Sequence, residues 1–468
     1  MATLIRRYAD TGMFEYVEPD YTGYGAGMAA LSPNDAFFFR QWALKNTGMF
    51  PSWQKGKPDA DIDMDEAWSV ETGDSSIIIS ILDTGVRLSH PEIESRLWMN
   101  PDEIPSNGTD DDNNNYVDDI YGWDFANSDN DPTDDHGHGT NVTGILGAIG
   151  NNSIGYAGVD WHARLMIHKI LNADNWGYYS WWASAIVYSV DKGARVINMS
   201  VGGESFSQLL KDAVDYAYQN NVTIVVSMMN ANNDVPYYPA AYSNTIAVGA
   251  TDTDDTRANP FFWGGGSNYG AHIDVVAPGN IIYGLNHESD TDYDWYWGGT
   301  SQAAPHVAGL ASLLLAQDNS RTPDDIRAII RNTAEDQVGD SLEDTPGWDP
   351  YYGYGRINAY NALTYAYTAI NESEDLPSVA SILTLQQNYP NPFNASTTIQ
   401  YTLYRSTRIL VSVYDVLGRR IREIVNDYQS PGEYRIDFDA KDLSGGIYYL
   451  VVEADKREKH AIKMFFVK

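Results

Sequence analysis

Residues 77–85 read Ile-Ile-Ile-Ser-Ile-Leu-Asp-Thr-Gly, an apolar and largely β-branched run that ends in a carboxylate and a glycine. Such a run is typical of a parallel strand that is buried on both faces and carries a polar residue at its carboxyl end. Similar runs lie at 195–203, 222–230 and 244–251. Helical patterns lie between the apolar runs, at 182–193 and 206–220. Because strands and helices alternate, we expect an α/β fold with a doubly wound, mostly parallel sheet flanked by helices.

The remaining segments differ in composition from this region. A length of 468 residues suggests roughly two to four domains. A polar tract at 369–381 has the composition of a linker. After it, residues 382–468 carry short alternating strands between Gly, Asn and Pro turns, which predicts a small all-β, immunoglobulin-like sandwich. We therefore expect a main domain at 31–368, preceded by an N-terminal segment at 1–30.

The net charge of −34 comes from the first part of the chain, because residues 382–468 hold 10 acidic and 12 basic side chains. This field repels nucleic-acid phosphates and anionic membrane surfaces, and no apolar run approaches the roughly 18 residues of a membrane span. The absence of cysteine excludes disulfides, zinc thiolates and cysteine nucleophiles. The first ten residues lack the apolar stretch of a signal peptide, which indicates either a cytosolic protein or a trimmed chain.

Three separate segments supply the chemistry of an activated serine. Asp83 ends the apolar run, His138 stands between glycines before a helical pattern, and Ser301 begins another helical pattern. A serine hydroxyl needs an imidazole to accept its proton, and the imidazole needs a carboxylate to hold its tautomer. The carboxyl edge of a doubly wound sheet is where such groups can converge from distant positions.

An oxyanion hole is the fourth requirement, since negative charge develops on the carbonyl oxygen during acyl transfer. Asn230 follows the apolar run at 222–229, so its side-chain amide is a candidate donor. The backbone N–H of Ser301, at a helix N-terminus, is the second candidate.

Taken together, residues 30–365 resemble the subtilisin-like serine proteases. The matching strings are Asp-Thr-Gly-Val at 83–86, His-Gly-Thr-Asn-Val-Thr-Gly at 138–144, Ser-Val-Gly-Gly at 200–203, Asn230, Ala-Pro-Gly at 277–279 and Gly-Thr-Ser-Gln-Ala-Ala-Pro-His-Val-Ala-Gly at 299–309. The resemblance implies a serine endopeptidase acting on protein or peptide substrates. It also implies that Ser200, Val201, Gly202 and Gly203 bind the substrate backbone as an added strand.

The chain departs from the family pattern at three positions. The family usually has histidine where Asn141 stands and methionine where Gln302 stands. Met229 replaces a glycine that commonly precedes the oxyanion asparagine, so the shape of the primary specificity pocket does not carry over.

Two other function classes remain open at this point. His136 and His138 could be metal ligands at alternate positions, as in a metallohydrolase. A cell-surface adhesion protein could also keep the scaffold without catalysis. His306 and the aromatic residues Trp295, Tyr296 and Trp297 are interpreted as packing residues.

The acidic loop before His138 indicates calcium binding. No Lys or Arg lies between Arg96 and Arg164, while carboxylates crowd the segment 109–135 and repel one another unless a cation joins them. The alternate-position spacing of a calcium loop predicts ligands at Asp110, Asp112 and Asn114, with Asp118 or Asp119 as the closing ligand. Ca2+ is accordingly the expected structural cofactor.

The family resemblance implies two further calcium sites. One comprises Asp124, Asp129, Asp131 and Thr133, at a matching offset before His138. The other comprises Asp35, Glu92 and Asn152 and would hold the mature N-terminus. Glu92 stands there where aspartate is usual.

The two ends of the chain also resemble known elements. Residues 14–21 are similar to the last strand of the inhibitory propeptide of this family, most of which would be missing, and residues 33–48 resemble a mature N-terminus. Self-cleavage between Asp20 and Pro33 is the resulting hypothesis. Residues 382–468 resemble the C-terminal sorting domain of the type IX secretion system. This resemblance implies that the type IX secretion machinery is a partner and that the protein is located outside the cell or on the surface of a Gram-negative bacterium.

Overall fold

The computed structural model describes residues 30–49, 56–366 and, with gaps of one to three residues, 383–467. The chain divides into two compact units, residues 1–368 and 369–468, which are described separately. Most of the N-terminal segment at 1–30, including the propeptide-like stretch, and the whole of 369–381 lie outside the described residues.

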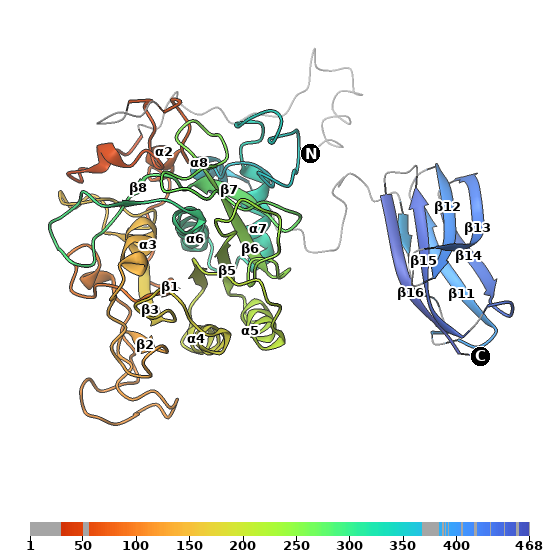
Figure 1. The fold of residues 1–468 in the computed structure, drawn as a ribbon, viewed down its shortest axis with the longest axis horizontal. Helices are drawn as coiled ribbons and strands as arrows, with labels where there is room; N and C mark the ends of the chain where they lie inside the picture. The colour runs from red at the N-terminus through yellow and green to blue at the C-terminus, as the bar shows by residue number, and fades with distance from the viewer. Residues whose placement is uncertain are drawn as a thin grey trace, which may run out of the picture. The chain divides into compact units, whose positions relative to one another are not determined.

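A seven-stranded parallel sheet forms the centre of the first unit, in the order β2-β3-β1-β4-β5-β6-β7 (Figure 1). Its strands are β1 (Ile78–Asp83), β2 (Gly122–Asp124), β3 (Arg164–Lys169), β4 (Val196–Met199), β5 (Thr223–Ser227), β6 (Thr245–Thr251) and β7 (Val275–Pro278). The predicted α/β class and parallel sheet are confirmed.

Helices cover both faces of this sheet, as Figure 1 shows for α6 on one side and for α4 and α5 on the other. One layer consists of α3 (His138–Gly147), α6 (Thr300–Gln317), α7 (Pro323–Thr333) and α8 (Ala359–Thr364); the other consists of α4 (Tyr179–Asp191) and α5 (Gln208–Gln219). The alternation of side chains along β1 supplies both cores. Ile79 and Ile81 pack into the α6 layer, and Leu82 packs into the α4 layer.

Short elements complete the first unit: η1 (Phe38–Arg40), α2 (Met64–Ala67), η2 (Glu94–Arg96), and the two-stranded ribbon of β8 (Ile282–Tyr283) and β9 (Tyr296–Trp297). The start of α7 follows the sequence expectation closely. The Thr322 side chain accepts a hydrogen bond from the Asp325 amide, the Asp325 carboxylate accepts one from the Thr322 amide, and Pro323 takes the first helical position.

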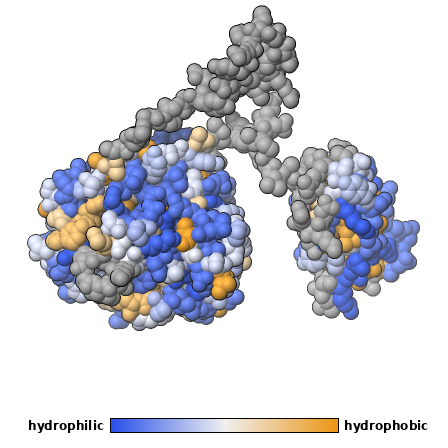
Figure 2. Space-filling model, turned by 90° about the horizontal axis from the view of Figure 1, so that it is seen from above, coloured by the Kyte–Doolittle hydropathy of each residue, from blue (hydrophilic) through white to orange (hydrophobic). Residues whose placement is uncertain are grey.

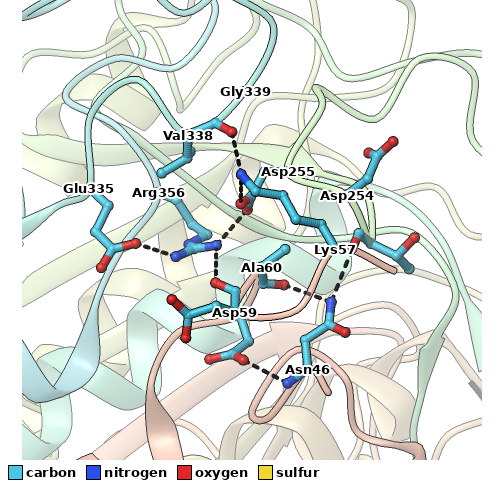
Figure 3. A network of polar contacts seen from close by, with 12 residues as sticks. Asn46, Lys57, Asp59, Ala60, Asp254, Asp255, Glu335, Val338, Gly339 and Arg356 are labelled. Carbon is cyan, nitrogen blue, oxygen red and sulfur yellow. Dashed lines mark hydrogen bonds and ion pairs between the residues drawn. The ribbon is translucent and has the colours of Figure 1, made fainter. Parts of the chain in front are cut away.

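A buried arginine joins both ends of the first unit (Figure 3). Arg356 donates to the Asp255 carboxylate at 2.5 Å, to the Asp59 carbonyl at 2.9 Å, and to Glu335. Lys57 reaches the same Asp255 carboxylate at 3.1 Å from the other side. These contacts connect the segment around Lys57 and Asp59 with Arg356, which lies just before α8.

The second unit is a sandwich of two antiparallel sheets, in the orders β10-β11-β14 and β13-β12-β15-β16. Its strands are β10 (Leu383–Leu385), β11 (Ser396–Leu403), β12 (Thr407–Asp415), β13 (Arg420–Gln429), β14 (Gly432–Asp439), β15 (Gly446–Ala454) and β16 (Glu458–Phe466). Inward residues such as Ile399, Val411 and Leu450 form one core between the sheets. The predicted all-β sandwich is confirmed.

The visible face of each unit in Figure 2 is mostly hydrophilic, with hydrophobic residues in small patches. Within the described ranges, every helix is too short or too polar to cross a membrane.

Candidate active site

Asp83 and His138 form a buried pair at the carboxyl edge of the sheet. Asp83 is the last residue of β1, His138 is the first residue of α3, and His138 Nδ1 lies 2.6 Å from Asp83 Oδ1. Gly137 has φ 103°, a left-handed conformation that lets the chain turn into α3. At Gly139 a Cβ would collide with the Gly85 carbonyl, so glycine allows α3 to approach β1 this closely.

The charge of Asp83 affects the pKa of the His138 imidazole. Burial disfavours the imidazolium, but the Asp83 carboxylate outweighs burial through its charge and its hydrogen bond, and the pKa of His138 is raised. Since Nδ1 is held by Asp83, Nε2 is the ring nitrogen left to exchange protons with another group.

Ser301 is the second residue of α6 and lies against the segment that follows β4. Its Oγ is 3.4 Å from the Ser200 carbonyl, and the Ser200 hydroxyl donates to the Ser301 carbonyl at 2.9 Å. Ser301, His138 and Asn230 all line one cavity of about 650 Å³. The fold thus brings a serine at a helix N-terminus into the cavity that the imidazole also faces.

Asn230 is held in one orientation by α6. Its Oδ1 accepts a hydrogen bond from the Thr300 amide at 2.8 Å and another from the Thr300 hydroxyl at 3.0 Å. A backbone amide can only donate, so this contact assigns the oxygen of the Asn230 side chain. The Nδ2 group is therefore left as a donor, and Asn230 lines the same cavity as Ser301.

The segment 200–203 forms part of the cavity wall. Gly203 exchanges two backbone hydrogen bonds with Tyr238, at 3.0 and 2.8 Å, so its main-chain groups are already used. A Cβ on Gly203 would collide with the Tyr179 hydroxyl, and one on Gly202 would lie 2.8 Å from Met229 Cγ. A Cβ at either position would therefore require the neighbouring Tyr179 or Met229 side chain to move.

Aromatic side chains line much of the remaining cavity: Trp176, Tyr179, Trp182, Phe262, Trp263, Trp295, Tyr296 and Trp297. The Trp297 ring meets the His138 ring edge-on at 5.7 Å. Interpreting residues 295–297 as packing residues was therefore incomplete, because they also face the site. The density of aromatic residues just before Ser301 is the sequence signal that was available.

The metal alternative uses His136 and His138, whose ring centroids are 6.4 Å apart. His138 Nδ1 is engaged by Asp83, and the two histidines belong to no group of three His, Asp or Glu ligands within 4.8 Å of one another in the described ranges.

The predicted calcium loop at 110–119 closes on itself through its own side chains. Asp110 accepts from the amides of Asn114 and Asn115 at 3.0 and 2.8 Å, and the Asn114 side chain donates to Asp119 at 2.7 Å. Carboxylate oxygens of Asp112 and Asp119 lie within 4.8 Å of one another and of Glu103, which the sequence did not single out. Lys192, which directly follows α4, forms an ion pair with Asp112 and already supplies one positive charge there.

The second predicted set is more dispersed. Asp124 accepts from the amides of Ala126 and Asn127, both at 2.8 Å, and Asp131 accepts from Thr133. Unlike the Glu103 group, the carboxylates of Asp124, Asp129 and Asp131 do not all lie within 4.8 Å of one another.

The third predicted set fits a cation best. The Asn152 side chain donates to Glu92 at 2.7 Å, and the Asn151 amide donates to Asp35 Oδ2 at 2.6 Å. Asp35 Oδ1 is buried without a hydrogen-bond partner among the described residues. Burial, together with nearby Asp35, raises the pKa of Glu92 to about 8. Two buried carboxylates with an unmatched oxygen are what a bound cation would compensate.

A doubly wound sheet with a serine, an imidazole and an amide lining one cavity is the arrangement of the class of hydrolases that use an activated serine. Within that class, the model of the subtilase family matches residues 74–355, more than half of the chain, and the protein belongs to the subtilase family. The family prediction and the assignment as a subtilisin-like serine endopeptidase are confirmed. Residues 387–468 match a secretion system C-terminal sorting domain, which indicates export through the type IX system.

Individual relatives agree with this assignment. A thermophilic serine proteinase of Bacillus sp. is 35% identical and is matched over 77% of this chain and 76% of its own. Thermitase of Thermoactinomyces vulgaris is 36% identical over 68% of this chain and 99% of its own. A solved protease structure from Pseudoalteromonas arctica, 24% identical with a TM-score of 0.55, covers 71% of this chain and 98% of its own and shares the fold.

Proposed function

We propose that this protein is a secreted endopeptidase that cleaves proteins and peptides through an acyl-enzyme on Ser301. The observation that supports it most directly is the buried Asp83–His138 pair, whose imidazole lines the same cavity as Ser301. Ser301 Oγ attacks the scissile carbonyl carbon while its proton passes to His138 Nε2. The same proton then goes to the leaving amine, and a water molecule, activated by His138, hydrolyses the ester.

Asn230 Nδ2 and the Ser301 amide are the proposed donors to the oxyanion. The Thr300 contacts hold Asn230 in place before the reaction, so little reorganisation is needed when charge develops. We propose that Ser200, Val201 and Gly202 contact the substrate backbone. Gly203 completes the wall but has its own backbone groups paired with Tyr238.

Calcium is the proposed structural cofactor, and Asp35, Glu92 and Asn152 are the set whose contacts support it best. A bound Ca2+ would supply positive charge to the two buried carboxylates and link the segment around Asp35 to the loop at 151–155. The loop at 110–119 and the set at 124–133 are weaker candidates, since hydrogen bonds within each loop already engage many of their oxygens.

The sorting domain supports a location outside the cell or on the surface of a Gram-negative bacterium. The inhibitory propeptide is a further proposed partner, with self-cleavage between Asp20 and Pro33. N-terminal sequencing of active enzyme tests this cleavage, and an enzyme that is active with Met1 intact would contradict it.

Replacing Ser301 tests the catalytic proposal. We expect S301A to fold normally, to lose hydrolysis of a denatured protein substrate, and to lose covalent labelling by a fluorophosphonate. The matched control is S184A, which removes an exposed serine of α4 and should label and cleave like the parent. Substantial residual turnover by S301A would refute the role of Ser301.

Removing calcium tests the cofactor. Chelation should lower the melting temperature, and E92Q should reduce this sensitivity because one buried carboxylate is removed. The control D212N alters an exposed carboxylate of α5 and should keep the full response. An unchanged melting temperature after chelation would contradict the calcium sites.

A further inference from the structure

We infer that Met229 closes the primary specificity pocket, so that the enzyme favours substrates with a small side chain on the residue that supplies the scissile carbonyl, here called the acyl residue. The inference rests on the proposed function, because it concerns the same cavity and the same oxyanion donor.

The backbone at Met229 is the first part of the argument. Met229 has φ 73°, in the left-handed region that residues other than glycine, asparagine and aspartate rarely adopt. The position directly follows buried Met228 and directly precedes Asn230, which α6 holds through Thr300. A side chain is therefore present where the backbone alone would favour glycine.

The direction of the side chain is the second part. Met229 Cγ and Sδ lie only 2.8 and 2.9 Å from the point where a Cβ on Gly202 would stand. Met229 Sδ also lies 4.0 Å from the Ser227 hydroxyl. The thioether thus lies between the buried Ser227 hydroxyl, at the end of β5, and Gly202 in the cavity wall.

The extent of the cavity is the third part. Met229, Gly202 and Gly203 line it, but none of residues 231–240 does. Tyr237 lies behind this boundary, with its Cβ 3.5 Å from the same Cβ position on Gly202. Met229 is therefore where the cavity ends on this side.

These contacts limit the acyl residue. If the Asn230 amide holds the scissile carbonyl oxygen, the side chain of the acyl residue lies in the cavity that Asn230, Gly202 and Met229 line together. A large side chain would have to displace the thioether from Gly202. Glycine, alanine or serine requires no such movement, so peptides with these acyl residues are the expected substrate class.

Variants of Met229 test the inference with two peptide amides that differ only in an alanine or phenylalanine acyl residue. We expect the parent to favour alanine, as measured by the ratio of the two kcat/KM values. M229G removes the thioether and suits the left-handed backbone, so the ratio should move toward phenylalanine by about tenfold or more. M229A should move it in the same direction, and M229L, which keeps the bulk, should leave it close to the parent value.

Active-site titration with a fluorophosphonate separates the two possible failures. A parent enzyme that neither labels at Ser301 nor hydrolyses either peptide would overturn the proposed function, and the inference with it. A parent that labels and hydrolyses but favours phenylalanine would overturn the pocket inference alone. The same holds if M229G and M229A, labelled to the same extent as the parent, leave the ratio unchanged.

Discussion

At the scale of single residues, the hydrogen bond between Asp83 and His138 predicts the pH dependence of activity. The pKa of His138 is raised above its ordinary 6.5, chiefly because the Asp83 charge outweighs burial. A general base must be neutral, so kcat/KM should fall as the pH drops through this raised pKa. We expect the acid limb of the profile to have its midpoint above 6.5.

The variant D83N removes the charge that raises this pKa. We expect it to lower kcat by about 10⁴-fold and to move the midpoint of the acid limb downward. The exposed-carboxylate variant D212N should leave both unchanged. A parent profile with its midpoint at or below 6.5 would be inconsistent with Asp83 acting on His138.

Asn230 is the second residue whose role can be isolated, because its two ends make different contacts. N230A should lower kcat by about 100- to 1000-fold with little change in KM. N230D keeps an oxygen for the Thr300 amide and hydroxyl but offers no donor. If N230D lowers kcat as much as N230A does, the Nδ2 donor of Asn230 contributes to catalysis. If N230D keeps the kcat of the parent, Asn230 serves only to hold Thr300.

At the scale of elements, the segment 259–266 supports the strand that leads into α6. Trp263 donates from Nε1 to the Gly298 carbonyl at 2.6 Å and stacks on Phe261 at 5.5 Å. W263F should reduce the free energy of unfolding by about 1 kcal/mol, and it should also lower kcat/KM, because Gly298 lies three residues before Ser301.

A second tryptophan provides the matched control. Trp348 donates from Nε1 to the Ile273 carbonyl at 3.1 Å and does not line the cavity. W348F should cost similar stability without changing kcat/KM. Equal kinetic effects of W263F and W348F would show that the Trp263 contact has no special connection to the site.

The elements also show what sequence alone could predict. The strand ending at Asp83 and the cap of α7 are local features, since the apolar run and the Thr322–Asp325 spacing lie within a few residues. The ion pair of Lys192 with Asp112 and the position of Trp263 depend on contacts between distant segments. Strand β13 is hard to predict from its own sequence for a related reason, because it is largely exposed and its apolar pattern is weak.

At the scale of the whole molecule, stability of the first unit depends on charges buried far from the cleft. The side chains of Asp255 and Arg356 are each 2% exposed. Arg356 lies 101 residues after Asp255 and 297 residues after Asp59 in the sequence, yet it donates to both (Figure 3). Burial raises the pKa of Asp255, and Arg356 and Lys57 act against that rise. An unpaired charge in such a place is costly, whereas a paired one adds modest net stability.

The variant R356M should therefore lower the free energy of unfolding by about 3–5 kcal/mol, measured by urea denaturation. The double variant D255N/R356M should recover part of this loss, because it removes the carboxylate that R356M leaves uncompensated. Lys57 is half exposed, so K57M should cost only about 0–1 kcal/mol although it pairs with the same carboxylate. If R356M and K57M reduced the free energy of unfolding by the same small amount, these charges would contribute no more than surface ion pairs do. The segment around Lys57 would then be held to the domain by backbone contacts, such as the hydrogen bond from the Lys57 amide to the Thr253 carbonyl at 2.9 Å.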